Sequence, residues 1–220
     1  MDAQVKELTA IAETGVDAIV WVSNRLDLMN DGDDVWIANA KKLLAQLPED
    51  IAIGIYECPF PYKRLLTKKI LDWCISTGRF TFIKDTCCDP DMLDERLDQI
   101  KGTSVKLYNA NAQTLLYTLK NGAAGYSGVM ANFTPDLFQW LCENFDKDPE
   151  LAQKVQNFLC ITAFTESLAY PVTAKYHMNK VGVPMSLWSR SRDYKQFNKY
   201  QQMIIDDIMT AEEDVRKMIK

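Results

Sequence analysis

The chain has 220 residues, of which 47% are hydrophobic and 25% are charged, and its 25 Lys and Arg against 30 Asp and Glu give a formal net charge of -5. This composition supplies enough apolar side chains for a large core, and it excludes a disordered chain. A sequence pI near 5.0 without a run of Lys or Arg argues against a nucleic-acid partner, because affinity for phosphate backbones comes from clustered cations.

The sequence shows no sign of export, membrane insertion or metal binding. No stretch approaches the ~18 apolar residues that span a bilayer, and the N-terminal segment lacks the apolar run of a secretory signal. We therefore expect a cytoplasmic protein with no membrane partner and with reduced thiols. None of the cysteines has zinc-site spacing; they are Cys58, Cys74, Cys87, Cys88, Cys142 and Cys160.

Short apolar segments alternate with helical patterns through the first part of the chain. The predicted strands are 17–23, 51–57, 80–86, 104–109 and 125–131, and their near-continuous apolar runs are typical of strands buried on both faces of a parallel sheet. The predicted helices are 2–14, 33–47, 64–77, 90–101 and 111–121, each followed by Gly or Pro. Only helices follow, at 134–145, 148–168, 171–181 and 191–218.

This alternation indicates βα units. Right-handed units of this length form either a closed barrel or an open doubly wound sheet. Open sheets usually carry a Gly-rich phosphate loop such as G-x-G-x-x-G, and the sequence contains none, which favours the barrel. Polar residues gather at the C-terminal ends of the predicted strands, where a βα barrel places its active site. They are Ser23, Asn24, Tyr56, Glu57, Lys84, Asp85, Thr86, Tyr108, Asn109 and Asn132.

Lys84 stands out because it continues the apolar run 80–83. Burial lowers the pKa of a lysine, and a neutral amine is the nucleophile that forms an imine with a 2-oxo acid. The alternative is a lysine at the rim of the strand that pairs with Asp85. Tyr56 ends the preceding strand, where its hydroxyl could relay protons to that imine or simply belong to the core.

The flanks of these two residues carry a family pattern. A strand ending in Tyr56-x-x-Pro59, a helix, and then Ile83-Lys84-Asp85-Thr86 resembles the dihydrodipicolinate synthase and N-acetylneuraminate lyase family of class I aldolases. That family has a strand with Tyr-Asn-x-Pro, a helix, and a strand with Lys. The resemblance continues through 107–109, 122–128, 131–132 and 170–175, so it covers nearly the whole chain.

The resemblance implies an α/β fold of the TIM (β/α)8-barrel type with a C-terminal helical extension. About five βα units would be present, with residues 1–133 as a partial barrel containing the family's strands four to eight and residues 134–220 as the helical extension. Family members are usually tetrameric, so a homo-oligomer is expected. No metal and no organic cofactor is implied.

The resemblance also implies a Schiff-base lyase or aldolase acting on pyruvate or a related 2-oxo acid, with an aldehyde as second substrate. Carried over by position, Lys84 would form the imine and Tyr56 would shuttle protons beside the substrate carboxylate. The backbone of 126–128 would line the pyruvate pocket. The expected substrate-binding residues are Tyr126, Ser127, Gly128, Glu57 and Asn109.

Three departures argue against the synthase reaction itself. Pro61 stands where the synthases carry an Arg for the carboxylate of the second substrate. Glu57 replaces the usual Asn, and its carboxylate would repel a carboxylated aldehyde unless it were protonated or held in a salt bridge. Residues 23–25 replace a Pro-Tyr-Tyr run, so the tyrosine that synthases donate across a subunit interface is absent.

The largest departure is at the start of the sequence. Family members have three βα units before the segment that matches 17–23, including a Gly-Thr-Thr-Gly-Glu loop that holds the pyruvate carboxylate. Five strands do not close an eight-stranded barrel. We expect a truncated form of a longer enzyme; pairing with a second chain and self-association are the alternatives. The competing function is a catalytically silent fragment or scaffold of this fold that acts through association.

Overall fold

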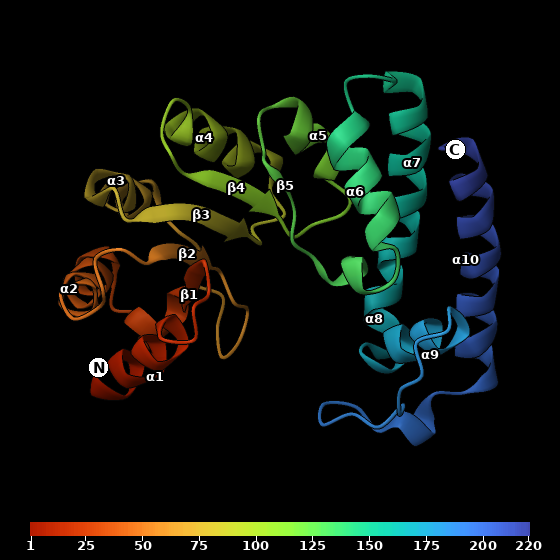
Figure 1. Cartoon of the computed structure of the whole chain (residues 1–220), viewed down its shortest axis with the longest axis horizontal. Coiled ribbons are helices and arrows are strands. Elements are labelled where there is room, and N and C mark those ends of the chain that lie inside the picture. The colour runs from red at the N-terminus through yellow and green to blue at the C-terminus, as the bar shows by residue number, and fades with distance from the viewer. The chain divides into compact units, whose positions relative to one another are not determined.

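The computed structural model describes residues 1–220, and the chain forms two compact units (Figure 1). The strand unit contains residues 1–109 and 121–124, and the helical unit contains residues 110–120 and 125–220. The expected parts, a partial barrel at 1–133 and an extension at 134–220, divide the chain at another point. That division stays a prediction, because compactness does not mark where a barrel ends.

Four βα repeats build the strand unit. Its strands are β1 (Ala18–Val22), β2 (Ala52–Tyr56), β3 (Phe80–Asp85) and β4 (Lys106–Asn109). Its helices are α1 (Asp2–Ala12), α2 (Asp33–Leu44), α3 (Lys68–Thr77) and α4 (Pro90–Ile100), and the short 3-10 helix η1 (Ser23–Leu26) follows β1. The predicted helix at 64–77 begins later, because the Thr67 hydroxyl caps α3 by accepting a hydrogen bond from the Ile70 N–H.

The strands form the parallel sheet expected from the sequence. Their order is β1-β2-β3-β4-β5, and β1 to β4 pair in parallel. The register sets Tyr56 of β2 opposite Lys84 of β3, and Lys84 opposite Tyr108 of β4. The C-terminal ends of these strands therefore lie together at one edge, where the polar residues were predicted to gather.

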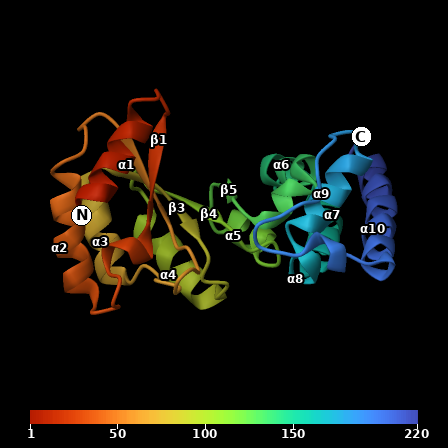
Figure 2. The same cartoon turned by 90° about the horizontal axis from the view of Figure 1, so that it is seen from below.

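Helices α1 to α4 line the outer side of the curved strand array (Figure 1; Figure 2 gives a second view). The core beneath them contains Ile19, Trp21, Ile53, Ile55, Ile83 and Leu107. The expectation that both faces of every strand are buried is wrong for β1, where Val20 points away from this core and is 44% exposed. The sequence concealed the difference because residues on the other face are also apolar or aromatic.

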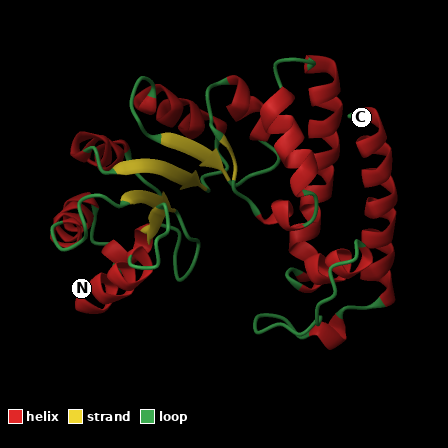
Figure 3. Ribbon diagram, viewed as in Figure 1, coloured by secondary structure: helices red, strands yellow, loops and turns green.

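The helical unit follows the predicted all-helical pattern with shorter pieces (Figure 3). Its helices are α5 (Leu115–Lys120), α6 (Pro135–Asn144), α7 (Pro149–Thr162), α8 (Glu166–Ala169), α9 (Val172–Lys180) and α10 (Lys199–Met218), with 3-10 turns η2 (Val129–Asn132), η3 (Ala163–Thr165) and η4 (Tyr194–Gln196). The predicted strand at 125–131 is only β5 (Gly125–Tyr126), since the chain turns into η2. Leu137, Leu141, Val155, Leu159 and Ile205 form the centre of its core.

Candidate functional site

Lys84 and Tyr56 form a contact pair at the C-terminal ends of β3 and β2. Both side chains are half-buried on the sheet face opposite the core under α1 to α4. The Lys84 Nζ lies over the aromatic ring of Tyr56, 4.3 Å from its centroid. An ammonium in this position is attracted by the negative face of the ring, which restrains an otherwise flexible side chain. The structure thus brings together the two residues that the sequence predicted to be catalytic.

The surroundings of this pair shift both titrations. Burial lowers the pKa of Lys84, and the nearby Cys58 thiol opposes the shift by favouring the ammonium. Burial raises the pKa of Tyr56, and the same thiol adds to that rise. The lysine is therefore more readily a neutral nucleophile than a solvated lysine is, while the tyrosine keeps its proton and can donate it.

The alternative in which Lys84 pairs with Asp85 is not what the structure shows. The Asp85 carboxylate is buried on the helix side of β3 and forms its ion pair with Arg96 of α4. Successive residues of a strand point to opposite faces, so Lys84 and Asp85 point away from each other. The amine of Lys84 is consequently left to the face that carries Tyr56.

Aromatic residues surround the Lys84 position on this face. Tyr108 pairs with Lys84 in the register of β4, and its ring packs edge-to-face on Phe82 with centroids 6.1 Å apart. Phe82 in turn lies against Gly54, where a side-chain methyl group would come within 2.1 Å of the Phe82 ring. Gly54 is therefore required for Phe82 to lie across the sheet. These contacts make a closely packed apolar floor beside the amine.

Glu57 does not point to this face. Its side chain is fully buried, and its carboxylate accepts hydrogen bonds from the backbone N–H of Leu66 at 2.7 Å and of Thr86 at 3.0 Å. It also forms an ion pair with Arg96, with the Nη2 to Oε1 distance at 2.6 Å. Of the two roles considered for Glu57, the structure shows the salt bridge. Its place among the substrate-binding residues stays a prediction.

Arg96 is a residue that the sequence pattern did not single out. Its guanidinium is buried, bonds both Glu57 and Asp85, and donates to the Leu66 carbonyl at 2.8 Å. A signal was present in the helix at 90–101, where Arg96 occupies the apolar stripe of Leu93 and Leu97. A charged residue in such a stripe needs a buried partner of opposite charge. Only its partners could not be identified from the sequence.

The loop at 57–67 after β2 is held by groups from η1 and α2. The Asn24 Nδ2 lies within hydrogen-bonding distance of three carbonyl oxygens of this loop, those of Cys58 at 3.0 Å, Phe60 at 2.7 Å and Tyr62 at 2.7 Å. Arg64 forms an ion pair with Asp33 at 2.8 Å, which anchors this part of the loop to α2. Pro61 lies in this anchored loop, after the cis Phe60–Pro61 bond.

The remaining predicted residues lie at two places. Asn109 is buried at the end of β4 in the strand unit, whereas Tyr126, Ser127 and Gly128 belong to the helical unit. The Tyr126 ring stacks on Phe138 with centroids 4.0 Å apart, and burial raises the pKa of its hydroxyl. A methyl group on Gly128 would come within 2.1 Å of that hydroxyl, so this segment requires glycine. The place of this segment among the substrate-binding residues stays a prediction.

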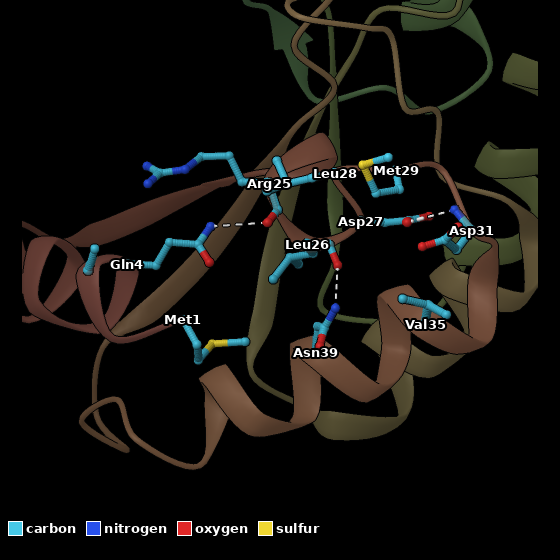
Figure 4. A pocket seen from close by; sticks show the side chains of 11 residues that line it. Met1, Gln4, Arg25, Leu26, Asp27, Leu28, Met29, Asp31, Val35 and Asn39 are labelled. Carbon is cyan, nitrogen blue, oxygen red and sulfur yellow. Dashed lines mark hydrogen bonds between the residues drawn. The ribbon is translucent and has the colours of Figure 1, made fainter.

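The strand unit also contains a pocket of about 450 Å³ next to η1 (Figure 4). Residues of α1, η1, α2 and the segment between η1 and α2 line it. One of the hydrogen bonds drawn as dashed lines runs from the Asn39 Nδ2 to the Leu26 carbonyl, at 2.9 Å. Lys84 and Tyr56 are not among its lining residues. The pocket is therefore distinct from the lysine–tyrosine pair.

Metal-binding clusters and membrane-spanning helices are both absent from the structure. No group of three or more His, Cys, Asp or Glu side chains is arranged to hold a metal ion. None of the helices combines the length and apolar character needed to cross a membrane.

Comparison with solved structures identifies the fold. A monomeric variant of dihydrodipicolinate synthase superposes with a TM-score of 0.81 at 14% identity, over 95% of this chain and 69% of that chain. The chain has the fold of the dihydrodipicolinate synthase family. The synthase from Thermotoga maritima gives a TM-score of 0.78 at 15% identity, over 96% of this chain and 71% of its own.

A third dihydrodipicolinate synthase family member is a prophage protein from E. coli K12, solved in complex with pyruvate. It matches with a TM-score of 0.80 at 16% identity, over 96% of this chain and 70% of its own. No family model and no curated protein matches the sequence. The resemblance and the α/β fold with five strands predicted from the sequence are confirmed, and identities this low extend the likeness to the fold alone.

Proposed function

We propose that this protein is a Schiff-base-forming lyase or aldolase that acts on pyruvate or a related 2-oxo acid, with Lys84 as the imine-forming nucleophile. The observation that carries the proposal is the placement of the Lys84 Nζ 4.3 Å from the centre of the Tyr56 ring, in surroundings that lower the pKa of the amine. A fold whose strand ends form an active site adds support. A lysine with only a surface role has no need of this burial.

The chemistry follows from the two side chains. The neutral Lys84 amine attacks the keto carbon, and the resulting carbinolamine loses water to give a protonated imine. The imine nitrogen withdraws electrons from the neighbouring carbon, which can then lose a proton and attack an aldehyde, or release one in the reverse direction. Tyr56 donates the proton that water carries away and recovers a proton in the next step. These steps use protein groups throughout.

Tyr126, Ser127, Gly128 and Asn109 remain proposed substrate-binding residues, on the ground of the family resemblance. The aldehyde would enter after the imine has formed. Glu57 would contribute through its buried bonds to the loop at 57–67, since its carboxylate is already paired. A cytoplasmic location and a homo-oligomeric assembly remain part of the proposal.

Reductive trapping tests this function directly. The protein is incubated with pyruvate and sodium borohydride, and the modified peptide is identified by mass spectrometry. We expect an adduct on Lys84 that is lost in Lys84→Met and retained in Lys106→Met. Lys106 is the matched control because it is an exposed lysine on the same sheet face.

Failure to trap any adduct, in protein whose circular dichroism shows the α/β fold, would contradict the proposal. The structure would then serve the competing role of a silent scaffold that acts through association. An adduct spread evenly over surface lysines, and unaffected by Lys84→Met, would contradict it equally.

A further inference from the structure

The covalent neighbours of the candidate pair meet behind the sheet. Glu57 follows Tyr56 and Asp85 follows Lys84, and side chains of successive extended residues point to opposite faces. Tyr56 and Lys84 therefore face one side, while Glu57 and Asp85 are buried on the other, beneath α4. Any force that fixes the two carboxylates also fixes the two strand ends that carry the candidate pair.

Arg96 supplies that force from α4. Its Nη2 lies 2.6 Å from the Glu57 Oε1, its Nη1 lies 3.1 Å from the Glu57 Oε2, and the same Nη1 bonds the Asp85 carboxylate. All three residues are at most 3% exposed. A planar guanidinium offers several donors in a rigid fork, so it can hold two carboxylates at a set separation.

A second link joins the same strand ends. The Thr86 hydroxyl donates to the Glu57 carbonyl at 2.8 Å, and the Thr86 N–H donates to the Glu57 carboxylate at 3.0 Å. The Glu57 carboxylate also accepts the Leu66 N–H, which joins the loop at 57–67 to the cluster. The ends of β2 and β3 are thus tied by side chains in addition to the ladder of backbone hydrogen bonds.

Stability alone does not account for such a cluster. Two buried carboxylates share one buried guanidinium, and burial raises the pKa of Glu57 while Arg96 acts against that rise. Well-packed apolar residues often stabilise a fold as much as a buried ion pair or more, because the charges lose their hydration. What apolar residues do not supply is a defined separation between two strand ends.

We propose that Arg96 is a positioning residue that sets the Lys84 amine against the Tyr56 phenol by holding Glu57 and Asp85 together. The inference rests on the proposed function and deepens it, since it names the group that makes the pair competent. Arg96 itself touches neither the amine nor the substrate. It acts through the strand ends, so its removal should impair the step that needs both Lys84 and Tyr56.

The experiment compares two substitutions at the cluster. Arg96→Lys keeps the positive charge but loses the fork. The triple variant Arg96→Met with Glu57→Gln and Asp85→Asn removes the bridge together with the charges of both carboxylates. It is included because it leaves no unpaired carboxylate charge in the buried cluster if Arg96→Lys does not fold.

Arg79→Lys is the matched control. The Arg79 guanidinium also links the segments that lead into β2 and β3, through the carbonyls of Pro48 and Ile51, but at the opposite end of the strands. The measurement is the initial rate of pyruvate adduct formation on Lys84, determined against pyruvate concentration well below the unfolding temperature. Reductive methylation of Lys84 with formaldehyde reports the reactivity of the amine without pyruvate.

The rate at saturating pyruvate should fall at least about tenfold in either Arg96 variant and stay unchanged in Arg79→Lys, while methylation of Lys84 changes less. In a Tyr56→Phe background the Arg96 substitution should cause little further loss, since effects that act through one contact are not additive. If the adduct formed as fast in both Arg96 variants as in the unsubstituted protein, the positioning role alone would be overturned. The same holds if the loss of rate caused by the Arg96 substitution added fully to the loss caused by Tyr56→Phe. Absence of any adduct in the unsubstituted protein would overturn the proposed function as well.

Discussion

Lys84 lies over the ring of Tyr56, with the Nζ 4.3 Å from the ring centroid, because the two residues are register partners on adjacent parallel strands. The relationship depends on strand pairing rather than on any turn of the chain between them. Burial lowers the pKa of Lys84 and raises the pKa of Tyr56.

The first prediction concerns pH. Burial lowers the pKa of Lys84, and only the neutral amine attacks a keto group, so the rate of adduct formation should rise with pH through that lowered pKa. Half of the maximal rate should be reached at a lower pH than for the amine of a free lysine derivative, whose pKa is about 10.4. The measurement is borohydride trapping across a pH series, with Nα-acetyl-lysine amide as the reference. Coincidence of the two profiles would contradict the burial of a reactive amine.

The second prediction concerns the phenol. Tyr56→Phe keeps the ring over Lys84 and removes the hydroxyl, so the rate of imine formation should fall by about 10²-fold or more while the half-saturating pyruvate concentration changes little. Stopped-flow or quenched trapping separates the two quantities. Tyr108→Phe is the control, since Tyr108 flanks Lys84 from β4 but packs on Phe82, and it should have the smaller effect. Equal losses in both variants would remove the case for Tyr56 as the relay.

The third prediction concerns the packing beneath the pair. Gly54→Ala places a methyl group 2.1 Å from the Phe82 ring, so the free energy of unfolding should fall by about 1–3 kcal/mol. Urea titration followed by circular dichroism measures the change. Gly54→Ala combined with Phe82→Leu should recover part of the loss, because the shorter side chain leaves room for the methyl group. A single variant as stable as the unsubstituted protein would show that Phe82 has room to move.

The fourth prediction concerns the loop after β2. Asn24→Ala removes the amide that bonds three carbonyls of this loop, and leaving buried acceptors unpaired costs about 1–3 kcal/mol. The same urea titration measures this loss. Asn39→Ala serves for comparison, because the Asn39 amide bonds a single carbonyl, that of Leu26, and its loss should be smaller. The reverse order would contradict the anchoring role of Asn24.

Most of the features that could be predicted, above all the strands, depend on residues that are close in sequence. The apolar runs and the Gly and Pro that follow the helices located the four strands of the strand unit, because such signals act within a few residues. Prediction was poorer where tertiary contacts compete with local preference. At 125–131 the chain forms two strand residues and then a 3-10 turn. At 64–67 the backbone does not enter a helix, because the Ser23 hydroxyl donates to the Arg64 carbonyl and the Leu66 N–H donates to the Glu57 carboxylate.

The sequence by itself determined the order of βα units, the resemblance to the aldolase family, and Lys84 and Tyr56 as the candidate pair. These rest on residue types at set spacings, which are local properties. The tertiary structure decided which groups those residues meet: the amine over the ring, Glu57 turned to the buried side, and Arg96 joining two strand ends. Arg96 is 39 residues from Glu57 and 11 residues from Asp85 in the chain, and only the pairing of strands and the packing of α4 bring these side chains together.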